Sequence, residues 1–218
     1  MKDYKFSLLS QILLLHPYKT LFWNDRKILF FADIHLGKAT HFRKHGIPIP
    51  ETIHNPDFER MDHLIKIYKP ERIIILGDLF HSAYNKSWLI FRRFCEENIT
   101  IKPELVVGNH DILDHIHYDF LTLHTEKLII EPFVLSHKPM EIQDLNGHYN
   151  LCGHIHPSVK ISGFAKQNLR VECFYFGKNI GILPAFGSFT GMSKMIHKYT
   201  EDKIFAVTDQ KIIHLSKK

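Results

Sequence analysis

The chain is poor in cysteine and in long hydrophobic runs. Its 218 residues include three cysteines, Cys95, Cys152 and Cys173, and no C-x-x-C pair, which excludes a disulfide framework and a zinc site built on thiolates. The N-terminal apolar run from Leu8 to Leu15 is interrupted by polar residues and is too short to span a bilayer. No small-x-small cleavage site follows it, so we expect a first strand there and a cytoplasmic protein.

Internal repeats, linkers and low-complexity segments are also absent from the chain. Ten prolines are spread along it, and its hydrophobic fraction of 44% and charged fraction of 23% are ordinary for a globular protein. We therefore expect a single domain spanning residues 1–218. The net charge of +5 permits an anionic partner without requiring one.

Histidine is the residue type present in excess, with seventeen copies in the chain. Imidazole is the commonest metal ligand in proteins and titrates near neutral pH. The excess therefore raises the question of whether some of these histidines bind metal, and their positions relative to the predicted strands bear on the answer.

Apolar, β-rich runs recur along the chain and predict strands. The predicted strands lie at residues 12–15, 28–31, 73–76, 105–107, 128–135, 149–152, 169–176, 180–183, 204–207 and 212–215. Helices are predicted over Pro56–Tyr68 and Ser87–Glu97, where apolar residues recur on one face. Alternating strands and helices predict βαβ units with a largely parallel sheet, and the strand-rich last third predicts antiparallel pairing. The sum is an α/β protein with two packed sheets.

Five successive predicted strands are followed by Asp, Asn or His. The segments that follow them are Asp33-Ile34-His35, Gly77-Asp78, Gly108-Asn109-His110-Asp111, Ser136-His137 and Gly153-His154-Ile155-His156. Ligands bind at the carboxyl ends of strands in α/β sheets, so one cleft is expected to collect these side chains. A D-x-H triplet arises about once by chance in this composition and G-N-H-D about 0.002 times, so the ordered set carries the prediction. A second pair, His115 and His117, follows no strand and is predicted to be solvated or partly packed.

Asp, Asn and His without cysteine suit Mn, Fe, Zn and similar divalent ions. The candidate ligands are Asp33, His35, Asp78, Asn109, His137, His154 and His156. This set is large enough for two ions if one carboxylate bridges them. Two metals about 3.5–4 Å apart clamp the attacking and leaving oxygens of a phosphoryl group and lower the pKa of a water between them. The neutral oxygen of Asn109 limits the negative charge of the site, which leaves net positive charge for an anionic substrate.

In this order, the motifs D-x-H, G-D, G-N-H-D, H and G-H-x-H resemble the calcineurin-like metallophosphoesterase superfamily from Asp33 to His156. The resemblance implies a four-layer αββα sandwich of two mixed sheets. It implies that one metal is held by Asp33, His35, Asp78 and His156, and a second by Asp78, Asn109, His137 and His154, with Asp78 bridging. It also implies that His110 is the non-ligand histidine of the N-H-D motif, with Asp111 as its partner. We expect the catalytic residue His110 to protonate the leaving oxygen and Asp111 to orient its ring. Mn is the favoured metal, and Fe, Zn and Ni are the alternatives.

A finer resemblance covers most of the chain. Residues 32–38, 42–50, 77–82 and 184–191 are similar to the ligase-associated DNA-damage-response endonuclease branch of that superfamily. This similarity implies DNA as the substrate and association with an ATP-dependent DNA ligase and a helicase. No membrane partner is expected. The sequence leaves the oligomeric state undecided, and an oligomer is possible.

Several residues beside the motifs have two interpretations. Arg43 belongs to a basic run at residues 38–45, which either binds substrate phosphate at the cleft mouth or is a solvated loop. His81 either contacts substrate or a group behind the ligands, or is an ordinary loop residue. Phe42, Tyr84 and Trp88 either stack on bases or pack in the core.

The predicted function is dinuclear-metal-dependent hydrolysis of phosphodiester bonds, by a DNA endonuclease or phosphodiesterase linked to DNA repair. An alternative is a phosphatase or diesterase acting on small nucleotides or other phosphate metabolites, because the same metal centre serves both. A non-catalytic scaffold, like the retromer-type subunits of the superfamily, is expected to lose the acid histidine or several ligands, and this sequence retains them.

Overall fold

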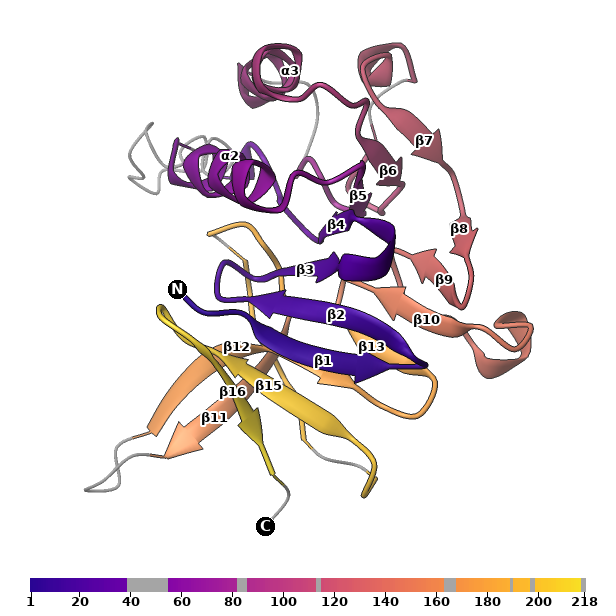
Figure 1. The fold of residues 1–218 in the computed structure, drawn as a ribbon. Helices are drawn as coiled ribbons and strands as arrows, with labels where there is room; N and C mark the ends of the chain where they lie inside the picture. The colour runs from indigo at the N-terminus through magenta and orange to yellow at the C-terminus, as the bar shows by residue number, and fades with distance from the viewer. Residues whose placement is uncertain are drawn as a thin grey trace.

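The computed structural model of the protein describes residues 1–38, 55–81, 86–112, 115–162, 168–188, 190–196 and 199–216. Within these ranges, two β-sheets pack face to face and two α-helices cover the outer side of the first sheet (Figure 1). This layered arrangement brings the carboxyl ends of strands from both sheets toward each other.

The first sheet consists of seven strands that lie side by side in chain order. They are β1 (Tyr4–Leu8), β2 (Gln11–His16), β3 (Thr20–Trp23), β4 (Ile28–Phe31), β5 (Arg72–Leu76), β6 (Glu104–Val106) and β7 (Thr122–His124). Neighbours from β1 to β4 are antiparallel, and neighbours from β4 to β7 are parallel. The carboxyl ends of β4, β5 and β6 therefore meet at one edge of this sheet.

The second sheet is mixed and has the order β14-β11-β12-β13-β10-β9-β8, with β15 and β16 attached through β12. Its strands are β8 (Lys127–Ile130), β9 (Phe133–Ser136), β10 (Tyr149–Cys152), β11 (Pro157–Ser162), β12 (Asn168–Phe176), β13 (Ile180–Ile182), β14 (Ser193–Lys194), β15 (Lys203–Val207) and β16 (Ile212–Leu215). β9, β10 and β13 run parallel to one another. The carboxyl ends of β9 and β10 thus lie at the same edge.

The two sheets share one hydrophobic core because successive side chains of a strand point to opposite faces. In β4, Ile28 and Phe30 belong to the core between the sheets, whereas Leu29 and Phe31 belong to the core under the helices. Phe133 of β9 comes from the second sheet and packs in the shared core. The near-continuous apolar sequence of β4 follows from this burial on both faces.

The helical layer packs on the outer face of the first sheet. Its helices are α2 (Asn55–Tyr68) and α3 (Lys86–Asn98), each within one residue of its predicted bounds. Met61 and Leu64 of α2 and Trp88 and Phe91 of α3 pack against this face. None of the described helices is both long and apolar enough to cross a bilayer. The predicted α/β fold of two mixed sheets is confirmed, and within the described ranges no α-helix covers the second sheet.

The run at residues 128–135, predicted as one strand, is a hairpin. β8 and β9 pair antiparallel across the turn at Glu131 and Pro132. Proline has no N–H group to donate to a neighbouring strand, and it ends the first strand of the pair here. The strands β1, β3, β7, β11 and β14 are additions to the predicted set.

All three cysteines are free thiols buried in the protein interior. Cys95 lies in α3 and packs under the helices, whereas Cys152 in β10 and Cys173 in β12 belong to a separate cluster in the second sheet. Burial raises the pKa of the Cys95 and Cys173 thiols to about 12. The predicted lack of a disulfide framework is therefore confirmed.

Candidate metal centre

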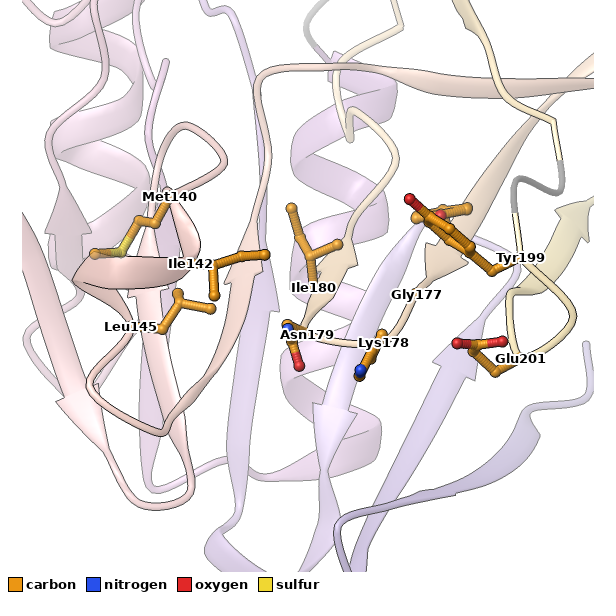
Figure 2. Close-up of a pocket in the computed structure, with 10 residues that line it drawn as sticks. Met140, Ile142, Leu145, Gly177, Lys178, Asn179, Ile180, Tyr199 and Glu201 are labelled. Carbon is orange, nitrogen blue, oxygen red and sulfur yellow. The ribbon is translucent and has the colours of Figure 1, made fainter.

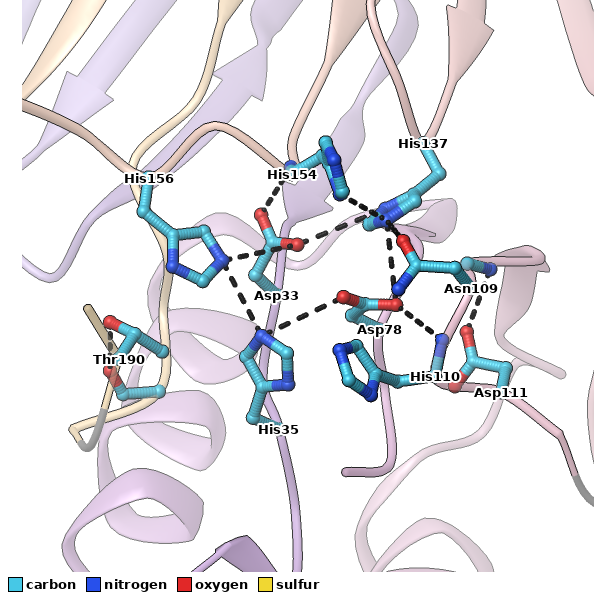
Figure 3. A network of polar contacts seen from close by, with 12 residues as sticks. Asp33, His35, Asp78, Asn109, His110, Asp111, His137, His154, His156 and Thr190 are labelled. Carbon is cyan, nitrogen blue, oxygen red and sulfur yellow. Dashed lines mark hydrogen bonds and ion pairs between the residues drawn. The ribbon is translucent and has the colours of Figure 1, made fainter. Parts of the chain in front are cut away.

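The structure brings all seven predicted ligands together where strand ends from both sheets meet (Figure 3). Asp33, Asp78 and Asn109 follow β4, β5 and β6 of the first sheet, whereas His137 and His154 follow β9 and β10 of the second. The ordered motifs of the sequence therefore correspond to one three-dimensional cluster.

The first group of side chains consists of Asp33, His35 and His156, whose candidate ligand atoms all lie within 4.8 Å of one another. The Nε2 atoms of His35 and His156 are 3.4 Å apart, and His156 Nε2 is 3.6 Å from Asp33 Oδ1. Two imidazole nitrogens and a carboxylate oxygen thus converge on one point.

The second group consists of Asp78, His137 and His154, joined by the side chain of Asn109. His137 Nε2 lies 3.0 Å from His154 Nδ1, 3.0 Å from Asn109 Oδ1 and 3.4 Å from Asp78 Oδ1. This group offers two nitrogens, one carboxylate oxygen and one neutral amide oxygen.

Asp78 stands between the two groups. Its Oδ1 faces His137 of the second group at 3.4 Å, and its Oδ2 lies 3.7 Å from His35 Nε2 of the first. A carboxylate in this position can offer one oxygen to each of two ions, as the resemblance implied for Asp78.

The donor set fits a pair of divalent ions. Asp33 and Asp78 are 0% and 2% exposed, and buried carboxylates are costly unless a cation neutralises them. Within the described residues, Asp33 Oδ1 has no hydrogen-bond partner although it points into the centre. The paired imidazole nitrogens also face each other at close range, an arrangement that a shared cation stabilises.

Backbone carbonyls behind the centre orient two of its histidines. His137 Nδ1 donates to the carbonyl of Leu76 at 3.1 Å, and His156 Nδ1 donates to the carbonyl of Gly191 at 3.2 Å. These bonds leave each Nε2 lone pair directed into the site, as in many metal centres. The sequence did not predict that the Gly191 carbonyl orients a ligand, although residues 184–191 belong to the finer family resemblance.

Five of the predicted ligands have a left-handed backbone. The φ angles are 51° at Asp33, 52° at His35, 50° at Asp78, 67° at His154 and 51° at His156. Asp and His tolerate this region better than most residues do, but each still costs of order 1 kcal/mol or more. Such strain concentrates at functional sites, where the surrounding structure holds it in place.

Glycine precedes two of the motifs because the chains approach closely there. A Cβ atom at Gly77 would lie 2.2 Å from His137 Nδ1, and one at Gly108 would lie 2.3 Å from both the amide nitrogen and Oδ1 of Asp78. The glycines of the G-D and G-N-H-D motifs therefore make room for the ligands themselves.

The pKa values of two histidines of the centre, His35 and His154, lie below the usual range, which favours the neutral form that binds metal. Burial, together with the nearby charge of Lys38 and the neighbouring imidazoles, lowers the pKa of His35 to about 2. Burial and repulsion from His137 and Lys138 lower the pKa of His154 as well. A neutral imidazole keeps the lone pair that a cation needs.

His110 lies at the rim of the centre, with its ring centroid 5.5 Å from that of His35 and stacked on His81 at 5.1 Å. The carboxylate of Asp111 accepts hydrogen bonds from the backbone amides of Gly108 at 2.9 Å and Phe80 at 3.1 Å. These contacts join two loops, and the role of Asp111 in orienting the His110 ring stays a prediction. Burial raises the pKa of Asp111 to about 7.

Other predicted positions lie apart from this cluster. Arg43, Phe42 and Tyr84 fall outside the described residues. Trp88 is 5% exposed and donates from its indole nitrogen to the carbonyl of His117 at 2.7 Å, so it packs in the core rather than stacking on bases. His117 lies in the 3₁₀ helix η3 (His115–Tyr118), outside the two ligand groups.

A separate apolar hollow of about 380 Å³ lies at the turn before β13 (Figure 2). It is lined by Met140, Ile142, Leu145, Ile180 and Tyr199 among others. Because β10 and β13 are parallel, this turn is at the sheet edge opposite the carboxyl end of β10 and its ligands. The hollow is therefore distinct from the metal centre.

A family model described as calcineurin-like phosphoesterase matches residues 26–185. The chain belongs to the calcineurin-like phosphoesterase family. The matched range contains all seven candidate ligands and His110. Members of this family bind divalent metals, so the two groups around Asp78 are its metal-binding candidates, and the role of each ligand stays a prediction.

Solved structures of other phosphoesterases are similar to this one. The nuclease MPE of Pseudomonas putida is 26% identical and aligns over 98% of this chain and 100% of its own, with a TM-score of 0.81. Yfce, a phosphoesterase from E. coli, is 17% identical over 87% of this chain and 98% of its own, with a TM-score of 0.44. The family and the MPE similarity show that the chain is a hydrolase of phosphoric esters.

One curated protein also matches part of this phosphoesterase. It is a quinolinate synthase of Herpetosiphon aurantiacus, 28% identical over 97 residues, which are 41% of this chain and 25% of that protein. The chain thus spans about a quarter of the length of this curated relative.

Proposed function

We propose that the protein is a dinuclear-metal-dependent phosphodiesterase that cleaves DNA. The observation that carries the proposal is the pair of ligand groups sharing Asp78, with two oxygens facing opposite groups at 3.4 and 3.7 Å. The similarity to a nuclease over the full length of both chains supports DNA as the substrate.

Each group of residues in the centre has a proposed role in metal binding or catalysis. Two bound divalent ions supply Lewis acidity to the phosphoryl oxygens and lower the pKa of an attacking water. Asp33, Asp78 and Asn109 would supply the oxygen ligands, and backbone carbonyls orient the imidazoles of His137 and His156. The neutral Asn109 oxygen keeps the centre from carrying excess negative charge toward a phosphodiester.

His110 is the proposed proton donor. Its ring stands at the rim, close to His35. Within the described ranges, no carbonyl or carboxylate accepts a hydrogen bond from its ring nitrogens. From there a ring nitrogen can protonate the leaving oxygen of a substrate. Its stacked neighbour His81 and the basic residue Arg43 are proposed to contact the substrate.

Substitution of His110 tests this assignment. His110→Asn is expected to retain bound metal, measured by elemental analysis, and to lose about 10²–10⁴ in turnover of an alkyl phosphodiester. The loss should be much smaller on an activated aryl diester, because its leaving group needs little protonation. Wild-type turnover of the alkyl ester by this variant would contradict the assignment.

A substrate panel tests the proposed function as a whole. Wild-type protein with Mn²⁺ is assayed on a simple diester, a 2′,3′-cyclic nucleotide, a monoester, and single- and double-stranded DNA. Cleavage of DNA supports the proposal, whereas activity confined to the monoester or the cyclic nucleotide would favour an enzyme of small phosphate metabolites. Removal of metal with EDTA should abolish activity, and Mn²⁺, our proposed native metal, should restore it better than Zn²⁺, Ni²⁺ or Fe²⁺.

We further propose that the enzyme acts in DNA repair in the cytoplasm, in functional association with an ATP-dependent DNA ligase and a helicase. The three free, buried thiols are consistent with a reducing compartment. Co-purification of the tagged protein with a ligase or helicase from its own cells, before and after DNA damage, tests this association.

A further inference from the structure

A hollow of about 380 Å³, lined in part by charged residues, lies beside the metal centre. It lies at the carboxyl end of β9, and its lining includes His137, Lys138, Lys127, Ser136 and Met140. His137 is shared with the second ligand group. The hollow therefore adjoins the metal centre at His137.

A fully buried amide lies behind the residues that line this hollow. Asn150 of β10 is 0% exposed, and its Nδ2 donates to Ser136 Oγ at 2.8 Å while its Oδ1 accepts from the backbone amide of Met140 at 3.0 Å. Ser136 Oγ in turn donates to the carbonyl of Lys138 at 2.7 Å. These bonds fix the segment from Ser136 to Met140 and hold the backbone of Lys138 next to His137.

Among the described residues, the two lysines in the lining are not held in ion pairs. Lys138 is exposed and Lys127 is half-buried, and within the described ranges neither makes an ion pair within 4 Å. Arg72 and Lys19, by contrast, each pair with a glutamate.

We propose that this hollow is a binding subsite for the phosphate of a nucleotide next to the cleaved bond, with Lys127 and Lys138 as its anion-binding groups. The proposal rests on the proposed function and deepens it, because such a subsite is useful for a polynucleotide and not for a lone phosphoester. Glu126 and Asp144 also line the hollow and oppose a bound anion, so their removal should have the opposite effect to removal of the lysines.

The test compares a short single-stranded DNA with a simple diester. In Lys127→Ala/Lys138→Ala, the ratio of kcat/KM for the DNA to kcat/KM for the diester should fall about tenfold or more, the loss expected for one charge-assisted hydrogen bond. The slope of log kcat/KM for DNA against log salt concentration should become shallower by about 0.7 for each lysine that contacts a phosphate. Lys138→Arg should retain most of the ratio, because it keeps the charge.

Matched variants control for general effects. Lys5→Ala removes an exposed lysine from the edge strand β1 and should leave the ratio and the slope at wild-type values. Glu126→Gln should raise the ratio. A wild-type protein that cuts the diester but no DNA would overturn both the function and the subsite. DNA cleavage with a wild-type ratio and slope in the double lysine variant would overturn the subsite and leave the function standing.

Discussion

The candidate ligand residues lie in a strained backbone conformation. Asp33, His35, Asp78, His154 and His156 all have positive φ angles, a conformation in which Cβ crowds the backbone. The cost is offset by specific bonds, such as the one from the His154 amide to Asp33 Oδ2 at 2.8 Å. Because the strained residues bond to one another, their conformations depend on the assembled centre rather than on local sequence.

Gly108→Ala is predicted to displace the candidate ligand Asp78 by a steric clash. The added methyl would lie 2.3 Å from the amide nitrogen and Oδ1 of Asp78, so Asp78 must move. We expect metal affinity and turnover to fall by about 10–100-fold, as for other changes that displace a metal ligand, measured by metal titration and by diester hydrolysis. Gly191→Ala is the control, since a methyl there meets nothing within 4 Å and the carbonyl is retained. Equal losses in both variants would contradict the steric explanation.

At the scale of elements, polar contacts join the parallel strands away from the centre. Arg72 of β5 donates to both carboxylate oxygens of Glu104 of β6, at 2.7 and 2.9 Å, and His124 of β7 lies 2.8 Å from the same carboxylate. One side chain thus links three neighbouring strands. Burial works to raise the pKa of Glu104, but the bonds from Arg72 and His124 outweigh it and leave that pKa lowered.

Glu104→Gln is predicted to destabilise the protein in a pH-dependent way. A lowered carboxyl pKa contributes stability that is present above the ordinary pKa and is lost as the pH falls through the folded value. We expect the variant to lose about 1 kcal/mol at pH 7, allowing for solvent screening, and to approach the wild type at acidic pH. Urea unfolding at pH 7 and pH 3.5 measures the difference. Glu96→Gln, in an exposed pair with Arg92, should change little, and an equal effect there would contradict the prediction.

The elements also show what the sequence could predict and where prediction stopped. α2 and α3 were predictable because their apolar faces repeat at helical spacing. β4, β5, β6 and β10 were predictable because each is a short apolar, β-rich run. The hairpin of β8 and β9 was concealed within one continuous apolar run. Likewise, Asp111 bonds to the Phe80 amide, a loop-to-loop contact that depends on register between distant strands and leaves no sequence pattern.

At the scale of the whole molecule, the first sheet, α2 and the N-terminus meet at His16. His16 is 4% exposed, its Nδ1 accepts a hydrogen bond from the Tyr18 amide at 2.9 Å, and its ring packs edge-on against Tyr68 of α2. A protonated ring would have no lone pair at Nδ1 to accept that bond. Burial lowers the pKa of His16 to about 4, against a weaker opposing pull from Asp3.

Protonation of His16 at acidic pH is therefore predicted to lower the free energy of unfolding. Between the ordinary pKa of about 6.5 and the folded value of about 4, the unfolded chain binds the proton more readily, so stability falls as the pH drops through this window, by roughly 2–4 kcal/mol in all. His16→Asn keeps an acceptor oxygen and removes the titration. The variant should lose less stability than the wild type between pH 7 and pH 4.5, followed by chemical denaturation. His63, at an exposed position, adds a smaller lowering of the His16 pKa, so His63→Asn should reduce the pH dependence less than His16→Asn does.

The three buried cysteines allow local unfolding to be measured by thiol labelling. A thiol reagent can attack Cys95 only when the packing of α3 on the first sheet loosens, and Cys152 or Cys173 only when the second sheet does. Labelling rates at the three positions, separated by mass spectrometry, would then give the rate of local opening near each cysteine without any engineered substitution. Cys152 directly precedes the loop of His154 and His156, so metal that braces this loop should slow labelling there more than at Cys95.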